Sequence, residues 1–219
     1  MFSDPCGTLL IPTLMLIACL APIGCASQDD APAARVSSDL SAPKPAALTF
    51  LRAIAAGDAH TAQAASAGTP AQKECVVAMV SLVNGLRHYD QALLGRFGQE
   101  AVPADVDLRQ ALQSMTQDPI THVEGGIVSE ANDAALIYPA VGGMKLAAHA
   151  PMHMRKEGKI WKVDLAAMSD EPRYSPEVGR RYRAAGKALS DAARHIRAGR
   201  YRTLGEAEQA VAQDMDFNR

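Results

Sequence analysis

Apolar residues recur every three or four positions where the folded part of the chain begins, a spacing typical of helices. The spacing of Leu48, Leu51 and Ile54 predicts a helix that ends near Gly57, where a short second helix begins. The run from Thr69 to Gln72 has the form of a capping box with proline at the first helical position, so another helix should start there.

This third helix is expected to be the longest element, from Pro70 to about Phe97, with Gly98 ending it. At about 100° per residue, its apolar side chains fall on one arc. The members of the arc are Cys75, Met79, Leu82, Val83, Leu86, Tyr89, Leu93 and Phe97. A weaker helix is expected over residues 105–115.

From residue 121 the apolar pattern changes to a period of two, which indicates strands. Strands are expected at 121–128, 134–138, 144–154 and 159–165. In the last of them Trp161, Val163 and Leu165 share one face. Since short connections join these strands, neighbours should be antiparallel. Helices followed by such a sheet predict an α+β fold.

The helical spacing returns after Ser175 and continues to Gly199. Its apolar seam comprises Val178, Tyr182, Ala185, Leu189, Ala192 and Ile196. A second capping box at Thr203 opens a short helix that should end near Met215. Residues 175–215 are therefore expected to form a helical appendage that packs back on the domain.

The N-terminus reads as an export signal. Residues 8–24 are almost wholly apolar but number only 17, fewer than the roughly 20 that a membrane-spanning helix needs, so we expect residues 1–24 to be a signal peptide. The sequence before Cys25 resembles the lipobox of bacterial lipoproteins, and Cys19 is a competing lipidation position with a better-matched consensus. Residues 25–43 should form a flexible tether.

This interpretation predicts an exported protein of the cell envelope, attached to the membrane by a lipid anchor. A plain signal peptide cut after Ala26, giving a periplasmic or secreted soluble protein, is the alternative. Of the four cysteines only Cys75 belongs to the predicted folded part, so no internal disulfide is expected. Its apolar helical setting predicts a buried, inert thiol.

Composition changes the picture in two ways. The chain carries 22 Lys and Arg against 24 Asp and Glu, a net charge of −2 that excludes a globally basic nucleic-acid binder. It also contains 41 alanines among its 219 residues but only 5% aromatics. This balance favours helices that pack closely through small side chains and argues against an aromatic-lined cofactor cleft; no cofactor is expected.

The order of elements, with helical residues 47–58 followed by a meander that ends in the Gly158–Leu165 strand, resembles the NTF2-like superfamily of SnoaL-like and ketosteroid-isomerase-like proteins. The resemblance implies a cone-shaped roll over residues 44–168, and a homodimer formed through the outer face of the sheet. The catalytic tyrosine and paired aspartates of the isomerases match no position in this chain, so none is transferred.

Asp90 lies near the middle of the apolar arc of the long helix, where an unpaired carboxylate is costly to bury. One interpretation makes it a general base inside a cone pocket, with Tyr89 contributing to the same pocket. The other makes it a structural ion pair with Arg52 or Arg96, or an exposed side chain near the helix end.

The histidines do not predict a metal site. On a continuous strand His149 and His153 would lie about 13 Å apart, too far to share an ion, and only His122 offers a third partner. Their shared face also carries Lys145 and Arg155, which indicates a solvated surface. Gly-rich phosphate loops and serine nucleophile motifs are absent from the sequence as well.

The C-terminal helix presents a basic face, made of Arg180, Arg183, Lys187 and Arg194. Anionic lipid or an acidic wall polymer is its expected partner, and a merely solvated face is the alternative. Two functions remain open at this stage: a lipid-anchored, non-catalytic binding or scaffolding protein, or a small-molecule enzyme, isomerase- or hydrolase-like, that uses Asp90.

Overall fold

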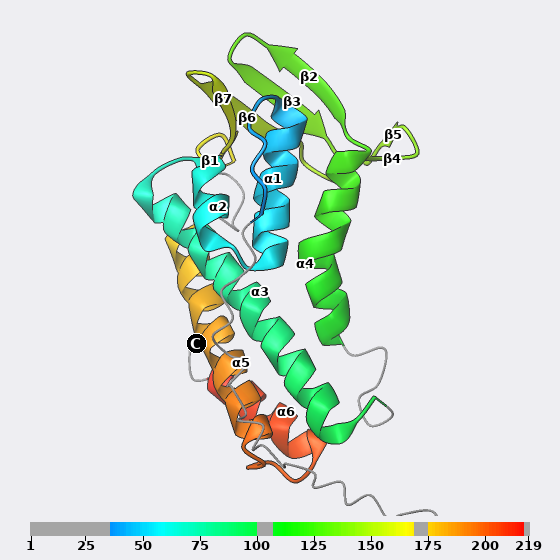
Figure 1. Cartoon of the computed structure of the whole chain (residues 1–219), viewed down its shortest axis with the longest axis vertical. Helices are drawn as coiled ribbons and strands as arrows, with labels where there is room; N and C mark the ends of the chain where they lie inside the picture. Colours follow the sequence, from blue (N-terminus) through cyan, green and yellow to red (C-terminus); the bar gives the residue numbers. More distant parts are fainter. Residues whose placement is uncertain (1–35, 100–106, 169–174, 217–219) are drawn as a thin grey trace, which may run out of the picture. The chain divides into compact units, whose positions relative to one another are not determined.

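The computed structural model describes residues 36–99, 107–168 and 175–216, shown in colour in Figure 1. All of them belong to one compact unit, Ala33–Arg219, which mixes helices and strands as expected. The helices are α1 (Pro43–Ala56), α2 (Ala59–Ala64), α3 (Pro70–Phe97), α4 (Asp107–Glu124), α5 (Pro176–Arg197) and α6 (Leu204–Asp216). The strands are β1 (Ser66–Ala67), β2 (Ile127–Ala131), β3 (Ala134–Tyr138), β4 (Ala140–Val141), β5 (Met144–Lys145), β6 (Met152–Glu157) and β7 (Ile160–Asp164).

The main sheet has five strands in the order β1-β7-β6-β3-β2, and β4 pairs with β5 in a separate hairpin. The meander β2-β3-β6-β7 is antiparallel, which confirms the prediction, whereas the two-residue β1 pairs parallel with β7. The alternation in β7 is confirmed too: Trp161 and Val163 are buried, and Lys162 between them is partly exposed. Helix α1 contacts β7 and β6 and covers this buried face (Figure 1).

Helix α3 takes part in two hydrophobic clusters. Its first half packs with α1, α2 and the sheet, while its second half packs with α5 and α6. The predicted capping box is present, with Thr69 Oγ1 accepting from the Gln72 amide at 3.3 Å and Gln72 Oε1 accepting from the Thr69 amide at 2.8 Å. Gly98 ends the helix as expected, with φ of +82°. At about 1.5 Å per residue, α3 is long enough to join both clusters in one continuous element.

Helices α3 and α5 lie side by side, and glycines bring their backbones together (Figure 1). A Cβ built on Gly186 would lie 2.7 Å from the Ser81 carbonyl oxygen, and one on Gly85 would lie 2.6 Å from the Gly186 carbonyl oxygen. Near the start of α5, a Cβ on Gly179 would lie 2.8 Å from Cys75 Sγ. The expectation that helices pack through small side chains is therefore confirmed, although glycine as well as alanine makes the contact. The buried stripe of α5 also differs from the predicted seam, since Tyr182 and Val178 are only partly buried.

The first predicted strand was wrong. Residues 121–124 continue α4, and the strand begins only at Ile127. Leu112, Met115, Ile120 and Val123 pack against the first cluster and carry the helical spacing across Pro119, which lies inside the helix. The apparent period of two in residues 121–124 therefore belongs to the end of the apolar face of α4.

The predicted strand 144–154 was also wrong, because it is two strands separated by a loop. Gly142 and Gly143 both have positive φ and form the tight turn of the β4–β5 hairpin, which ends at Lys145. Backbone bonds from Leu146 to Pro139 and from His149 to Leu146 then turn the chain before β6 starts at Met152.

The predicted tether ends earlier than expected. The Val36 amide donates to Asp58 Oδ2 at 3.2 Å, and the Trp161 amide donates to the Leu40 carbonyl at 2.8 Å. Val36 and Leu40 also pack against the first hydrophobic cluster. Residues 36–42 are thus held against the domain, and α1 begins at Pro43.

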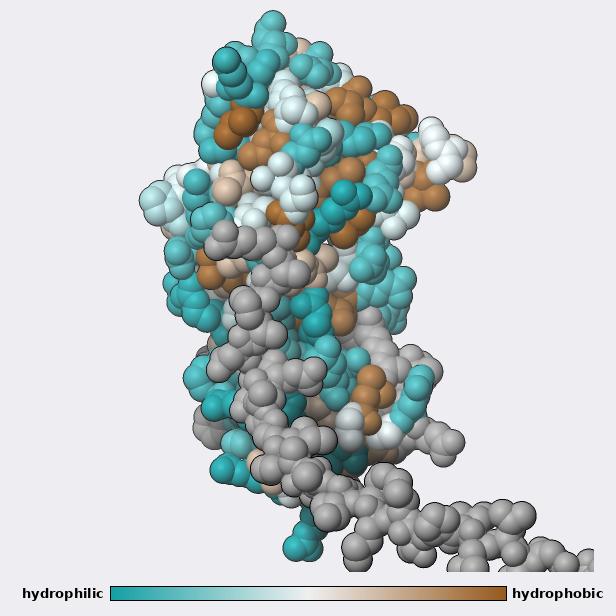
Figure 2. Space-filling view, viewed as in Figure 1, coloured by the Kyte–Doolittle hydropathy of each residue, from teal (hydrophilic) through white to brown (hydrophobic). Residues whose placement is uncertain are grey.

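Large apolar side chains are exposed mainly on β2 and on the β4–β5 hairpin. They are Ile127, Val128, Val141 and Met144, together with Ile160 on β7. Figure 2 shows hydrophobic surface near the sheet, with hydrophilic residues interspersed. Dimerisation through the outer face of the sheet stays a prediction.

Candidate binding pocket

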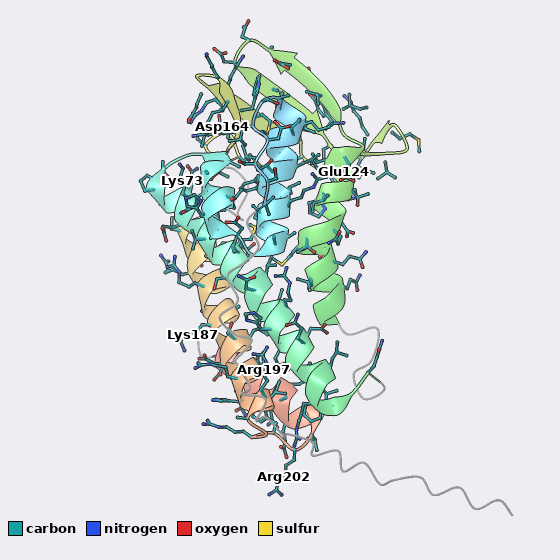
Figure 3. All side chains as sticks on the ribbon, viewed as in Figure 1. Lys73, Glu124, Asp164, Lys187, Arg197 and Arg202 are labelled. Atoms are coloured by element: carbon teal, nitrogen blue, oxygen red, sulfur yellow. The ribbon has the colours of Figure 1, made fainter. Side chains whose placement is uncertain are left out.

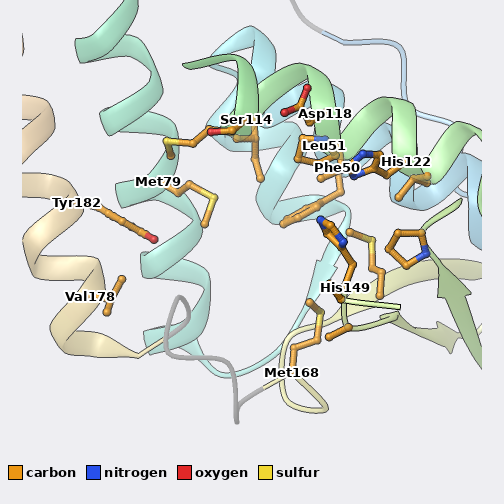
Figure 4. Close-up of a pocket in the computed structure, with 18 residues that line it drawn as sticks. Phe50, Leu51, Met79, Ser114, Asp118, His122, His149, Met168, Val178 and Tyr182 are labelled. Carbon is orange, nitrogen blue, oxygen red and sulfur yellow. The ribbon is translucent and has the colours of Figure 1, made fainter. Parts of the chain in front are cut away.

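The described residues enclose a pocket of about 840 Å³ (Figure 4). Helices α1 and α4, the loop before β6, and single turns of α3 and α5 supply its walls. The lining residues are Phe50, Leu51, Ile54, Met79, Ser114, Met115, Asp118, Pro119, His122, Val123, Pro139, Ala148, His149, Ala150, Met152, Met168, Val178 and Tyr182. This volume lies in the range typical of small-molecule sites.

Most of the lining is apolar. Helix α1 turns Phe50, Leu51 and Ile54 toward the pocket because these positions share one face of a helix, and all three belong to the first hydrophobic cluster. Four methionines complete the apolar wall: Met79, Met115, Met152 and Met168. Methionine side chains are unbranched and polarisable, so a wall built from them adapts its shape to different apolar molecules.

The polar lining residues come chiefly from one face of α4. Ser114, Asp118 and His122 are four residues apart and follow one another along the helix in Figure 4. Ser114 Oγ donates to the Ala111 carbonyl at 2.9 Å, and Asp118 Oδ1 accepts from Gln113 Nε2 at 3.4 Å. Sequence reasoning missed this face because it placed residues 121–128 in a strand.

The loop before β6 brings His149 against His122. Their ring centroids are 5.1 Å apart and the rings meet edge to face at 73°. The prediction that His149 and His153 lie on one continuous strand was therefore wrong. His149 lies in a loop, and His153 lies on β6 opposite Leu136. No group of three His, Cys, Asp or Glu side chains within the described ranges is arranged to hold a metal ion.

Helix α5 also reaches the pocket. Val178 and Tyr182 line it, and Figure 4 shows the Tyr182 hydroxyl directed toward the cavity. The predicted C-terminal appendage thus contributes to the site, which its position in the sequence gave no reason to expect.

Asp90 and Tyr89 are not among the residues that line this pocket. Tyr89 is 5% exposed in the second cluster, and its hydroxyl has no hydrogen-bond partner among the described residues. Burial raises the pKa of Tyr89 to about 12. Asp90 is partly buried on α3, and Arg52, one partner considered for it, forms an ion pair with Glu124 at 2.8 Å. A catalytic role for Asp90 stays a prediction that the pocket does not support.

The basic face of α5 is exposed but partly neutralised. Arg183 pairs with Glu74 of α3 at 3.0 Å, and Asp191 pairs with both Lys187, at 2.6 Å, and Arg194. Hydrogen bonds from Lys187 and Arg194 lower the pKa of Asp191. Lys187 is labelled on the outside of α5 in Figure 3. Among the described residues Arg180 has no ion-pair partner, and binding of anionic lipid or wall polymer by this face stays a prediction.

A scan against protein-family models finds no match for this chain. Searches of curated proteins and of solved structures find none either. The NTF2-like resemblance therefore rests on the order of elements and on the Gly158–Leu165 strand, and it stays a prediction.

Three further observations concern membranes and thiols. No helix among the described residues is long and apolar enough to cross a membrane. The predicted signal peptide, Cys19 and Cys25 lie outside the described residues. Cys75 is a free, buried thiol as expected; burial raises its pKa, and its Sγ donates to the Ser175 carbonyl at 3.1 Å.

Proposed function

We propose that this protein is an exported, lipid-anchored, non-catalytic binding protein of the cell envelope, and that it binds an apolar small molecule in the α1–α4 pocket. The observation that carries the proposal is the 840 Å³ cavity lined mostly by apolar side chains. Cavities of this size that combine an apolar wall with a few polar groups are typical of ligand sites. The adaptable methionines favour a hydrocarbon ligand over a sugar or nucleotide.

The sequence supports the cellular setting. The apolar segment 8–24 followed by Cys25 favours export and lipidation, and a short linker up to Val36 would keep the pocket near the membrane surface. A membrane is the richest source of apolar molecules in an envelope. A lipid anchor and an apolar pocket would therefore both serve a protein that binds an apolar molecule at the membrane surface. We also propose the NTF2-like roll as the finer description of the fold, supported by helices that precede a meander.

Ligand binding is tested with a neutral fluorescent probe, N-phenyl-1-naphthylamine, and two tryptophan variants of adjacent residues. Ala148 lines the pocket, whereas Ala147 does not, and both are exposed, so neither change should prevent folding. We expect Ala148→Trp to reduce probe affinity at least tenfold, because the indole occupies part of the cavity that the probe would use, and Ala147→Trp to leave it unchanged. Equal binding by both variants and the wild type would overturn the assignment of the pocket.

The anchor is tested by intact-mass analysis of the mature protein from the membrane fraction. A diacylglyceryl modification on Cys25 that is lost in Cys25→Ser and kept in Cys19→Ser is the expected result. A mature protein that begins at Ser27 without lipid would refute the anchor while leaving the pocket assignment in place.

A further inference from the structure

The pocket contains one carboxyl side chain. Asp118 is the only Asp or Glu among its lining residues, and no lysine or arginine is among them. Asp118 is partly buried, and its one described hydrogen bond is the 3.4 Å contact from Gln113 Nε2, which leaves most of its acceptor capacity unused. Arg52 of α1 pairs with Glu124, and Lys145 of β5 lies 3.7 Å from the Tyr138 ring centroid.

Pro119 follows Asp118 inside α4. A proline inside a helix has no N–H, so the carbonyl four residues earlier, that of Met115, loses its helical partner. The side chains of Met115 and Pro119 both line the pocket beside Asp118.

Ser114 contributes acceptor capacity as well. Its hydroxyl proton is directed to the Ala111 carbonyl, so only lone pairs remain for a ligand. One face of α4 thus contributes a hydroxyl and a carboxylate, those of Ser114 and Asp118, to a pocket whose other walls are mostly apolar. This arrangement complements a positive charge or a hydrogen-bond donor and opposes an anion.

We propose that the ligand is an apolar molecule that carries one positively charged nitrogen, with its hydrocarbon between α1 and the methionines and its nitrogen beside Asp118. The inference rests on the proposed function, because it names the ligand class of the same pocket. Phe50 and Tyr182 are the two aromatic rings other than histidine in the lining, and aromatic rings attract cations placed over their faces.

The test compares three ligands that each carry an eight-carbon chain, below the concentrations at which they aggregate, by calorimetry at pH 8: octyltrimethylammonium, octanol and octanoate. This pH lies well above the pKa of free histidine. We expect octyltrimethylammonium to bind about tenfold more tightly than octanol, and octanoate to bind most weakly. Asp118→Asn should lower the affinity for the cation to that for octanol, while Asp133→Asn, at an exposed turn, should change nothing.

The outcomes separate the two proposals. Equal binding of the three ligands, or tighter binding of octanoate, overturns the charge preference; if that binding is lost in Ala148→Trp, the pocket assignment stands. Absence of binding by all three ligands and by the naphthylamine probe overturns the proposed function and this inference with it.

Discussion

The contact between α3 and α5 makes a strong prediction for Gly186→Ala. A methyl group at this position would lie 2.7 Å from the Ser81 carbonyl oxygen, 2.8 Å from its carbon and 2.9 Å from the Leu82 nitrogen. All three atoms belong to the backbone of α3, so no side chain can rotate away. The helices must separate by several tenths of an ångström to restore ordinary contacts.

Two effects of this substitution oppose each other. Alanine is the better helix former, by about 1 kcal/mol in a helix interior. Overpacking a close contact typically costs about 1–3 kcal/mol. The backbones also approach closely at Gly85, where a built Cβ would lie 2.6 Å from the Gly186 carbonyl oxygen. The difference between the two effects predicts that the free energy of unfolding falls by up to about 2 kcal/mol.

Gly95→Ala is the matched control, since Gly95 lies in α3, is exposed, and would place its Cβ more than 4 Å from other atoms. This variant should gain up to about 1 kcal/mol from helix propensity alone. Urea unfolding followed by circular dichroism measures both. If Gly186→Ala is stabilised as much as Gly95→Ala, the helices do not meet backbone to backbone, and the packing argument is refuted.

Three other substitutions test the electrostatics and the caps. Tyr89→Phe removes a buried hydroxyl without a described partner, so stability at pH 7 should stay equal or rise by about 1 kcal/mol. The pKa of Tyr89 is about 12 in the folded state, against an ordinary value of 10.0, so the folded state keeps this proton where the unfolded state loses it. The free energy of unfolding of the wild type should therefore fall as pH rises from 10 to 12, and that of the variant should fall less. Denaturant titrations across this pH range measure both, and an equal fall in the two proteins would contradict the prediction. Burial raises the pKa of Asp58, but hydrogen bonds from the Thr61 and Val36 amides outweigh this and hold it below its ordinary 3.8. Asp58→Ala should therefore cost about 1–2 kcal/mol near pH 7, with the difference from wild type shrinking as pH falls below about 4, and a constant difference would contradict it. Thr69→Ala should lower the free energy of unfolding by about 1 kcal/mol, because it removes the N-terminal cap of α3. Denaturant titration measures the change, and an unchanged value would mean that solvent replaces the cap.

Local signals in the sequence predicted most of the helices and two of the strands. The Thr69 capping box, Gly98 and the alternation around Trp161 act within a few residues, so their outcome depends little on the rest of the fold. Stretches with weak or mixed periodicity were assigned incorrectly, as in 121–128, where a helix end and a strand start adjoin.

The pocket could not be predicted in the same way, because its walls come from segments distant in the sequence. His122 and His149 meet only because a loop interrupts the expected strand, and Tyr182 reaches the cavity only because α5 packs on α3. Asp90 became a candidate because of its angular position on the long helix. That position depends on the sequence of one helix and does not tell which other elements pack around it. The nearest sequence signal for the true pocket was the spacing of Ser114, Asp118 and His122.

The shared helix α3 links pocket dimensions to a contact between residues that do not line the pocket. Met79 on α3 and Tyr182 on α5 both line the cavity, and the glycines at 85 and 186 set the distance between these two helices. Bulkier residues at the glycine positions would widen the gap between the walls by tenths of an ångström without altering any lining residue. Ligand size could thus diverge between related proteins through changes in the helical pair alone, so a comparison of their lining residues would overlook the difference.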